Sequence, residues 1–440
     1  MTTSGVYSAG TGIGVGLLGL GLVGSAVARA LGRRVDSPSG SCLQLIGGLV
    51  RDRDKLRDVP IDRKAIHSDP SAILNDPQVS IVVELMGGED PAFAYLKQAI
   101  RAGKHVVTAN KELLSTRGRE LLNMAAEHGV HLEYEASVGG GVPIIGPLSN
   151  DLQANEVISL RGIINGTSNY ILTRMEADGA SFADALNEAQ DLGYAEADPS
   201  SDVDGLDALY KMVILARIAF RTELPLSSIH CEGIRGVNAK DFRYANSLGY
   251  TIKLLAVARH EKDGLLARVH PALVPLSVPM ATVSGVLNAV EVEGDLVGSL
   301  WFQGRGAGAD PTASAVIGDI IRIARACLAG NVHTYDAISD NGLPIVTMDK
   351  HVCQYYMCIE ALDQPGVLAK IAGILGELEI SIHSVMQMDE DGEQGTADLV
   401  IMTHPACEDK MRAAVARIRD LDVVVSLANP LRAESYGSIG

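Results

Sequence analysis

A short apolar stretch that leads into a glycine-rich turn and then a helix is the feature that most constrains the fold of this chain. Residues 13–18 are apolar or glycine, and residues 22–31 repeat apolar side chains at helical spacing. The alternation continues with predicted strands at 43–50, 79–85, 105–108 and 130–135 and predicted helices at 91–102 and 112–128. Strands separated by helices indicate a parallel, doubly wound sheet.

Two overlapping GxGxxG matches lie in the turn. The match of Gly14, Gly16 and Gly19 would place the loop inside the strand, whereas the second match follows the strand and opens the helix. Only in the second do amides at a helix N-terminus meet a pyrophosphate. We therefore predict a Rossmann-type dinucleotide-binding domain over residues 13–135, with a turn that binds no ligand as the alternative. The predicted binding loop comprises Gly19, Leu20, Gly21, Leu22, Val23 and Gly24.

The residue after the second strand bears on the choice between NAD and NADP. An acid at this place favours NAD by bonding the ribose 2′-hydroxyl. Here the strand ends at Arg51, whose guanidinium could bind a 2′-phosphate. The neighbouring Asp52 complicates the choice, and an exposed surface arginine is the alternative. We predict NADP as the cofactor and leave NAD open.

Two lysines stand where hydride transfer from an alcohol would need a proton acceptor. Lys111 follows the strand at 105–108, at the sheet edge where ligands bind. Lys211 lies four residues after Asp207 on a predicted helix and precedes an apolar run, so its turn should be buried. A buried lysine beside carboxylates can have a pKa suited to proton transfer. The alternatives are a surface lysine and an ordinary ion pair.

Residues 136–303 predict an α+β substrate domain. Its expected elements are helices at 182–192 and 206–220 and strands at 251–258 and 287–293. An acidic cluster before Lys211 could bind a substrate ammonium group, or could be a solvated or cation-binding loop; its members are Glu196, Asp198, Asp202, Asp204 and Asp207. Residues 304–328, a glycine-rich turn and a helix at 312–327, should complete the dinucleotide domain, and residues 329–350 read as a linker.

Four separated motifs resemble the homoserine dehydrogenase family: AxxLGYxExDPxxDxxGxDAxxK, NGTSNYIL, TANKELL and GRGAGxxPTASAVxxD. The resemblance covers about residues 13–328. It implies the NAD(P)-dependent interconversion of L-homoserine and L-aspartate 4-semialdehyde in threonine and methionine biosynthesis.

The resemblance also implies roles for single residues. Lys211 resembles the proton donor and acceptor, and Lys111 a lysine near the nicotinamide and the substrate hydroxyl. Glu196 and Asp202 resemble ligands of the substrate amine, and Asp207 a carboxylate that orients substrate or lysine. Gly166 and Thr167 resemble substrate-lining positions, and Gly306 a late cofactor contact. The segment EASVGGGVP resembles a sodium-binding loop that offers oxygen atoms, mainly carbonyls, from Glu135, Val138, Gly140 and Val142; a tight turn without an ion is the alternative.

Residues 352–430 begin a new pattern. Predicted strands at 353–362, 381–388, 396–403 and 423–428 alternate with helices at 365–379 and 408–419 around a turn at 389–394, the ferredoxin-like βαββαβ order. The segment IEALDQPGVLAKIAGILGELEISIHSVMQ resembles an ACT domain. The resemblance implies pairing of subunits, as a homodimer or homotetramer, and binding of an amino acid, with threonine expected, near Asp363 and Gly366. Dimerisation without a ligand is the alternative.

Charge and composition narrow the partners and the location. The 37 basic against 54 acidic residues leave a net charge of −17, which gives no basis for binding nucleic acid or an anionic membrane. No apolar run is long enough for a membrane span, and no basic segment precedes the first apolar stretch as in a secretory signal. The six cysteines form no CxxC pair, so we expect free thiols and a cytoplasmic protein.

Two further functions compete with the main interpretation. A related dehydrogenase could act on another amino-acid alcohol or aldehyde, but a phosphorylating semialdehyde dehydrogenase needs a nucleophilic cysteine. Cys231 is the nearest candidate and lacks supporting neighbours. A non-catalytic amino-acid sensor on a dehydrogenase scaffold is the other alternative; the lysines and carboxylates described above argue against it.

Overall fold

The computed structural model describes residues 12–33, 43–330, 341–388 and 395–436. They fall into two compact units, each described by itself. Unit 1 takes its residues from Met1–Ile158, Tyr210–Leu226 and Asn288–Leu343, and unit 2 from Ser159–Leu209, Ser227–Leu287 and Pro344–Gly440. Cys42 and the turn predicted at 389–394 lie outside the described residues.

Unit 1 is built on a six-stranded parallel sheet in the order β3-β2-β1-β4-β5-β6. The strands are β1 (Ile13–Leu18), β2 (Leu43–Leu49), β3 (Ile66–His67), β4 (Val79–Glu84), β5 (His105–Thr108) and β6 (Leu132–Glu133). The predicted doubly wound sheet is therefore confirmed. The two-residue strand β3 is an addition that is too short to show a periodic signal.

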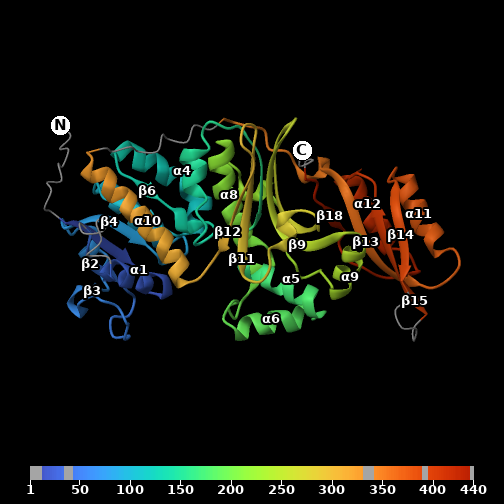
Figure 1. Ribbon diagram of the computed structural model, residues 1–440, viewed down its shortest axis with the longest axis horizontal. Helices are drawn as coiled ribbons and strands as arrows, with labels where there is room; N and C mark the ends of the chain where they lie inside the picture. Colours follow the sequence, from blue (N-terminus) through green and yellow to red (C-terminus); the bar gives the residue numbers. More distant parts are fainter. Residues whose placement is uncertain (1–11, 34–42, 331–340, 389–394, 437–440) are drawn as a thin grey trace. The chain divides into compact units, whose positions relative to one another are not determined.

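Helices cover the sheet of unit 1. They are α1 (Leu22–Arg33), α2 (Ser71–Leu74), α3 (Ala92–Arg101), α4 (Lys111–His128) and α10 (Ala309–Leu328). Helix α10 lies alongside α1 (Figure 1), and both pack on the β1 side chains Ile13, Val15 and Leu17. Every residue of β1 is buried, as expected for a parallel strand covered on both faces.

The strand predicted at 130–135 is shorter than expected. Only Leu132–Glu133 pair with β5, and a 3-10 turn follows at Glu135–Ser137. The backbone N–H of Glu135 donates to the Asp319 carboxylate (2.9 Å) on α10, so it is not available to a strand ladder. Unit 1 also holds the neighbouring strands β11 (Leu287–Gly294), except for its first residue, and β12 (Gly298–Arg305).

Unit 2 contains a long sheet whose strands run in the order β7-β9-β10-β18-β13-β15-β14. Its N-terminal part has β7 (Val157–Ile163), α5 (Gly166–Asp178), α6 (Phe182–Asp191), α7 (Ser200–Val203), β8 (His230–Cys231), α9 (Ala239–Ser247), β9 (Tyr250–Glu261) and β10 (Gly264–Pro275). Helix α8 (Leu206–Phe220) begins in unit 2 and continues into unit 1. Strands β7 and β10 were not predicted.

The C-terminal part of unit 2 has the predicted βαββαβ order. Its elements are β13 (Val352–Leu362), α11 (Val367–Glu377), β14 (Ile382–Met388), β15 (Thr396–Thr403), β16 (Ala406–Cys407), α12 (Glu408–Arg419), β17 (Val424–Leu427) and β18 (Leu431–Ala433). Helices α11 and α12 pack together over the strands (Figure 1) and share one apolar core with them. The helix predicted at 365–379 begins only at Val367. Gly366 has a φ of +95°, a left-handed conformation that precedes the helix instead of joining it.

Two further segments join the unit 2 sheet. Strand β18 pairs with both β10 and β13, so the residues after the predicted βαββαβ module are part of the same sheet. In the stretch read as a linker, residues 331–340 lie outside the described residues, and Ile345 forms a bridge with Leu265. Among the described helices, none combines the length and apolar character needed to cross a bilayer.

Candidate active site

Two glycines in the turn between β1 and α1 leave no room for a side chain, because a Cβ at either would collide with backbone atoms. Gly19 has a φ of +107°, and its N–H donates to the Leu49 carbonyl (3.0 Å) at the end of β2. A Cβ at Gly24 would lie 2.1 Å from the Gly19 carbonyl oxygen. The first turn of α1 can therefore approach the end of β1 closely, as a dinucleotide loop requires.

Gly21 faces open space instead. A Cβ there would meet no atom within 4 Å, and the adjacent Leu22 is exposed. The backbone at Gly21 is therefore accessible to a large group, and the amides of the first turn of α1 lie beside it. This arrangement fits a pyrophosphate at a helix N-terminus.

A second glycine turn of unit 1 supports the segment that precedes α10. A Cβ at Gly140 would lie 2.4 Å from the Gly306 carbonyl oxygen, and the Gly141 N–H donates to the Arg305 carbonyl (3.1 Å). The buried Asn288 amide lies so close that a Cβ at Gly306 would be 1.9 Å from its Nδ2. Gly306 is thus enclosed by protein on two sides.

The Glu135 carboxylate of the same region is held by three backbone amides. Ile144 and Ile145 donate to Oε1 (2.7 and 2.8 Å), and Gly146 donates to Oε2 (2.8 Å). Among the described residues, no group of acidic, histidine or cysteine side chains is arranged to hold a metal ion. The sodium site at Glu135, Val138, Gly140 and Val142 stays a prediction.

Arg51 and Asp52 differ in how they are engaged after β2. The Asp52 carboxylate accepts from the backbone N–H groups of Asp54 (2.8 Å) and Lys55 (3.3 Å), so it stabilises its own turn. Arg51 is exposed, and within the described residues it pairs with no acidic side chain. Of the two, the arginine is the side chain that is available to a cofactor.

A buried carboxylate organises the carboxyl ends of β4 and β5. Glu84, with no exposed surface, accepts from the Thr108 hydroxyl (2.6 Å) and from the N–H of Met86 (2.7 Å) and Gly87 (3.1 Å). The Thr108 hydroxyl in turn accepts from the Asn110 N–H (3.1 Å).

Asn110 caps α4 and thereby places Lys111 at the first position of that helix. Its Oδ1 accepts from the Leu113 N–H (3.1 Å), and its Nδ2 donates to the Gly88 carbonyl (2.7 Å). Lys111 therefore lies at the same edge of the sheet as the glycine loop, because parallel strands end at one edge.

Helix α8 is bound to α4 within unit 1. The buried Arg217 donates to the Leu114 carbonyl (2.8 Å) and pairs with Glu223 (2.8 Å). Burial and the Glu112 carboxylate raise the pKa of Tyr210, whereas Lys111 opposes the shift. Lys211, the next residue of α8, is 8% exposed.

Unit 2 brings together two of the predicted carboxylates. The Asn165 Nδ2 donates to Asp202 (2.7 Å) and to Asp207 (2.8 Å), and Asp207 is 4% exposed. Asp207 lies one turn before Lys211 on α8, as its spacing predicted.

The remaining predicted substrate residues of unit 2 lie at the start of α5 and in the loop before α7. Gly166 is the first residue of α5, and the Thr167 hydroxyl donates to the Tyr194 carbonyl (2.8 Å). Glu196 is exposed, and its carbonyl accepts from Gln190 (2.9 Å). The structure therefore does not join Glu196 to the Asp202–Asp207 pair.

The predicted effector residues lie beside one another before α11. Asp363 accepts from Gln387 of β14 (3.0 Å), and its N–H donates to the Gly395 carbonyl (2.8 Å). Gly366 is exposed, and a Cβ there would meet no atom within 4 Å.

Three family models match the chain in sequence order. The model described as the NAD-binding domain of homoserine dehydrogenase matches residues 19–135, the homoserine dehydrogenase model residues 143–321, and the ACT model residues 357–423. A homoserine dehydrogenase of Neisseria gonorrhoeae is 41% identical over 96% of this chain and 99% of its own length. The chain belongs to the homoserine dehydrogenase family.

Further relatives agree with the family. A homoserine dehydrogenase of Synechocystis is 42% identical over 95% of this chain and 98% of its own length. The crystal structure of a homoserine dehydrogenase from Thiobacillus denitrificans matches with a TM-score of 0.89 and 40% identity, over 97% of this chain and 99% of that one. The predicted function, NAD(P)-linked homoserine dehydrogenase activity with an ACT domain for amino-acid regulation, is confirmed.

The chemistry of Cys231 agrees with this family and not with a phosphorylating dehydrogenase. Burial, together with the nearby Asp204 and Glu232, raises the pKa of its thiol to about 11. A thiol that stays protonated near neutral pH is a poor nucleophile. Asp204 of the acidic cluster also has a structural partner, because it pairs with Arg235 (2.5 Å).

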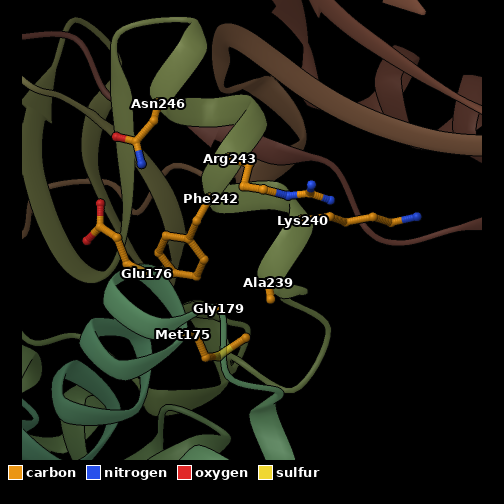
Figure 2. A pocket seen from close by; sticks show the side chains of 8 residues that line it. All are labelled: Met175, Glu176, Gly179, Ala239, Lys240, Phe242, Arg243 and Asn246. Carbon is orange, nitrogen blue, oxygen red and sulfur yellow. The ribbon is translucent and has the colours of Figure 1, made fainter. Parts of the chain in front are cut away.

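A cavity of about 360 Å³ in unit 2 lies between α5 and α9, and none of the predicted site residues lines it. Figure 2 shows Phe242 turned toward Met175 and Glu176 of α5, whereas Lys240 and Arg243 extend away from them. Lys240 pairs with Asp398 of β15 (2.9 Å), and Glu176 accepts from Thr251 (2.7 Å). The charged side chains are thus engaged in the fold.

Sequence reasoning missed three residues that organise the site: Glu84, Asn165 and Arg217. Glu84 ends an apolar strand, and an acid at the carboxyl end of a parallel strand was a usable signal. Asn165 begins the NGTSNYIL motif, where only the next two residues were singled out. Nothing in the sequence near Arg217 could identify its partners. An arginine in an apolar helix predicts that the buried charge is paired, but not with which residue.

Proposed function

We propose that Lys211 accepts the hydroxyl proton of homoserine, with Lys111 placed near the nicotinamide and the reacting oxygen. The observation that carries the proposal is the nearly buried Lys211 one helical turn after Asp207, whose carboxylate is held by Asn165. A carboxylate at this spacing orients the amine, and a desolvated lysine can lose its proton near neutral pH. Which of the two lysines transfers the proton is decided by the variants described below.

The chain's other residues hold the substrate in this proposal. Asp202 and Glu196 bind the ammonium group of homoserine, and Gly166 and Thr167 line the site at the start of α5. The protein contributes positioning and proton transfer. The nicotinamide, when bound, supplies the hydride chemistry.

NADP is the cofactor that we propose, bound by the loop Gly19–Gly24, by Arg51 and Lys111, and by Gly306. The exposed arginine after β2 and the self-engaged Asp52 support this choice. A hyperthermophilic archaeal homoserine dehydrogenase that is 26% identical, with a TM-score of 0.61, was solved in complex with NADPH. That complex supports the same cofactor for this chain.

Reduced-nicotinamide absorbance tests the proposal directly. With purified full-length protein, homoserine and NADP should give a steady increase in absorbance that NAD supports less well. No increase with either cofactor, at high enzyme concentration, would contradict the proposed reaction. Equal rates with both cofactors would contradict only the preference for NADP.

Regulation by threonine through the ACT domain is a further part of the proposal. The ACT match supports amino-acid binding, and Asp363 and Gly366 are the residues that we expect to contact it. Inhibition requires that the amino acid binds one conformation better than another. Pairing of ACT domains into a homodimer or homotetramer, and a cytoplasmic location, stay predictions.

A further inference from the structure

We propose that Asn165 is a positioning residue for the dehydrogenase reaction, because its amide group keeps Asp202 and Asp207 together and ionised. This inference rests on the roles proposed above for the two carboxylates. Asn165 itself was not among the predicted site residues, and it touches neither substrate nor cofactor in the proposed mechanism.

Every polar atom of the Asn165 side chain has a partner. Oδ1 accepts from the Ser168 N–H (2.8 Å) and so caps α5, while Nδ2 donates one hydrogen to Asp202 and one to Asp207. Ser168 adds a second connection, because its hydroxyl donates to the Asp202 carbonyl (2.8 Å). One 5% exposed side chain thus joins α5, α7 and α8.

The amide is suited to this place by its charge. The accepting oxygens of Asp202 and Asp207 lie close together, because both bind the same nitrogen. Two carboxylates at so short a distance repel each other when both are charged. Hydrogen bonds to the charged form favour ionisation, and a neutral donor supplies them without neutralising the pair. A lysine or arginine here would cancel the negative charge that an ammonium group is meant to meet.

The two functions of Asn165 can be separated by substitution. In Asn165→Asp, the side chain keeps an oxygen that caps the helix, because aspartate and asparagine are equally good N-caps. It loses both N–H donors and adds a third negative charge. Asn165→Ser also keeps a capping oxygen and adds no charge, but it cannot serve both carboxylates.

The test compares full-length variants in steady-state assays with saturating cofactor. Asn165→Asp should lower kcat/KM for homoserine on the order of 100-fold, and Asn165→Ser on the order of 10-fold, whereas the cofactor KM stays within about 2-fold. The acid limb of the pH profile of kcat/KM should move to higher pH by about one unit in Asn165→Asp, because the carboxylates lose their donors. A helix cap alone would not move this limb.

Asn238→Asp is the matched control, since Asn238 caps α9 and contacts neither carboxylate. It should keep wild-type kinetics. The proposal is overturned if both Asn165 variants keep the wild-type kcat/KM and pH profile while Asp207→Asn is impaired. If Asp202→Asn and Asp207→Asn are also unimpaired, the proposed roles of the carboxylates fail as well.

Discussion

The glycine loop of unit 1 and the carboxylate pair of unit 2 are positioned by different physical means. The loop depends on absent side chains, since added carbons at Gly19 and Gly24 would strike backbone atoms. The pair depends on a present side chain, the Asn165 amide, which lies 37 residues before Asp202 and 42 before Asp207. A local steric requirement therefore determines one site, and a long-range hydrogen-bond network determines the other.

This difference implies different responses to substitution. Backbone collisions cannot relax without opening the loop, so the loop should fail in an all-or-none manner. A hydrogen-bonded pair can lose one donor and keep part of its function, because the acids can take up a proton or move apart. The following variants test this contrast.

Gly24→Val should abolish measurable NADP binding, because its Cβ would lie 2.1 Å from the Gly19 carbonyl oxygen. Gly21→Ala is the matched variant: its Cβ meets no atom within 4 Å, so it should keep the wild-type melting temperature and raise only the KM for NADP. Cofactor titration by fluorescence measures both. Normal cofactor affinity in Gly24→Val, or in Gly21→Ala, would show that the loop does not work as described.

Lys211→Ala should lower kcat on the order of 100-fold or more, because proton transfer by a positioned side chain contributes at least that much. Lys111→Ala is measured in parallel by single-turnover absorbance, which separates the chemical step from product release. Turnover close to wild type in Lys211→Ala would transfer the role of proton acceptor to Lys111. Wild-type turnover in both variants would remove the lysines from the mechanism.

Arg51→Asp should raise the KM for NADP more than 10-fold and change the KM for NAD far less, because the arginine is the available cation for a 2′-phosphate. Arg53→Asp, an exposed neighbour in the same loop, should change neither. Steady-state kinetics with both cofactors measure the ratio. A parallel rise with both cofactors would exclude Arg51 from contact with the 2′-phosphate.

Glu84→Gln should destabilise the protein by about 1–3 kcal/mol, because the carboxylate accepts three hydrogen bonds and an amide oxygen with an NH2 group cannot replace them all. Thr108→Ser, which keeps the hydroxyl, should be much milder. Urea unfolding followed by circular dichroism measures both. Equal stability of Glu84→Gln and wild type would show that the hydrogen bonds of Glu84 do not stabilise the fold.

Threonine should change the apparent homoserine affinity about 5-fold or more, the range of ordinary allosteric coupling. Gly366→Val should remove the response, because a side chain would fill the open space before α11 and would be strained at a φ of +95°, whereas the basal rate should change far less. Initial rates of the wild type and of Gly366→Val, measured across a threonine titration, test both expectations. A flat curve in the wild type would leave the ACT domain a role in subunit pairing alone.

Residues close together in sequence explain what could be predicted. The strand–turn–helix order around Gly19, the βαββαβ order after residue 352 and the four-residue spacing of Asp207 and Lys211 are local, so periodicity and turn chemistry revealed them. Where a local rule met a distant partner it failed: the strand expected to reach residue 135 ends early because Asp319 takes the Glu135 N–H.

Folding alone decided the partners of the buried polar groups. Glu84 and its partner Thr108 are 24 residues apart, and Arg217 of α8 and its partner Leu114 of α4 are 103 residues apart. Asn165 is about 40 residues from the two acids that it bridges. A buried polar atom must find a partner, which is why these contacts exist. No pattern within one helix or strand specifies which distant atom that partner will be.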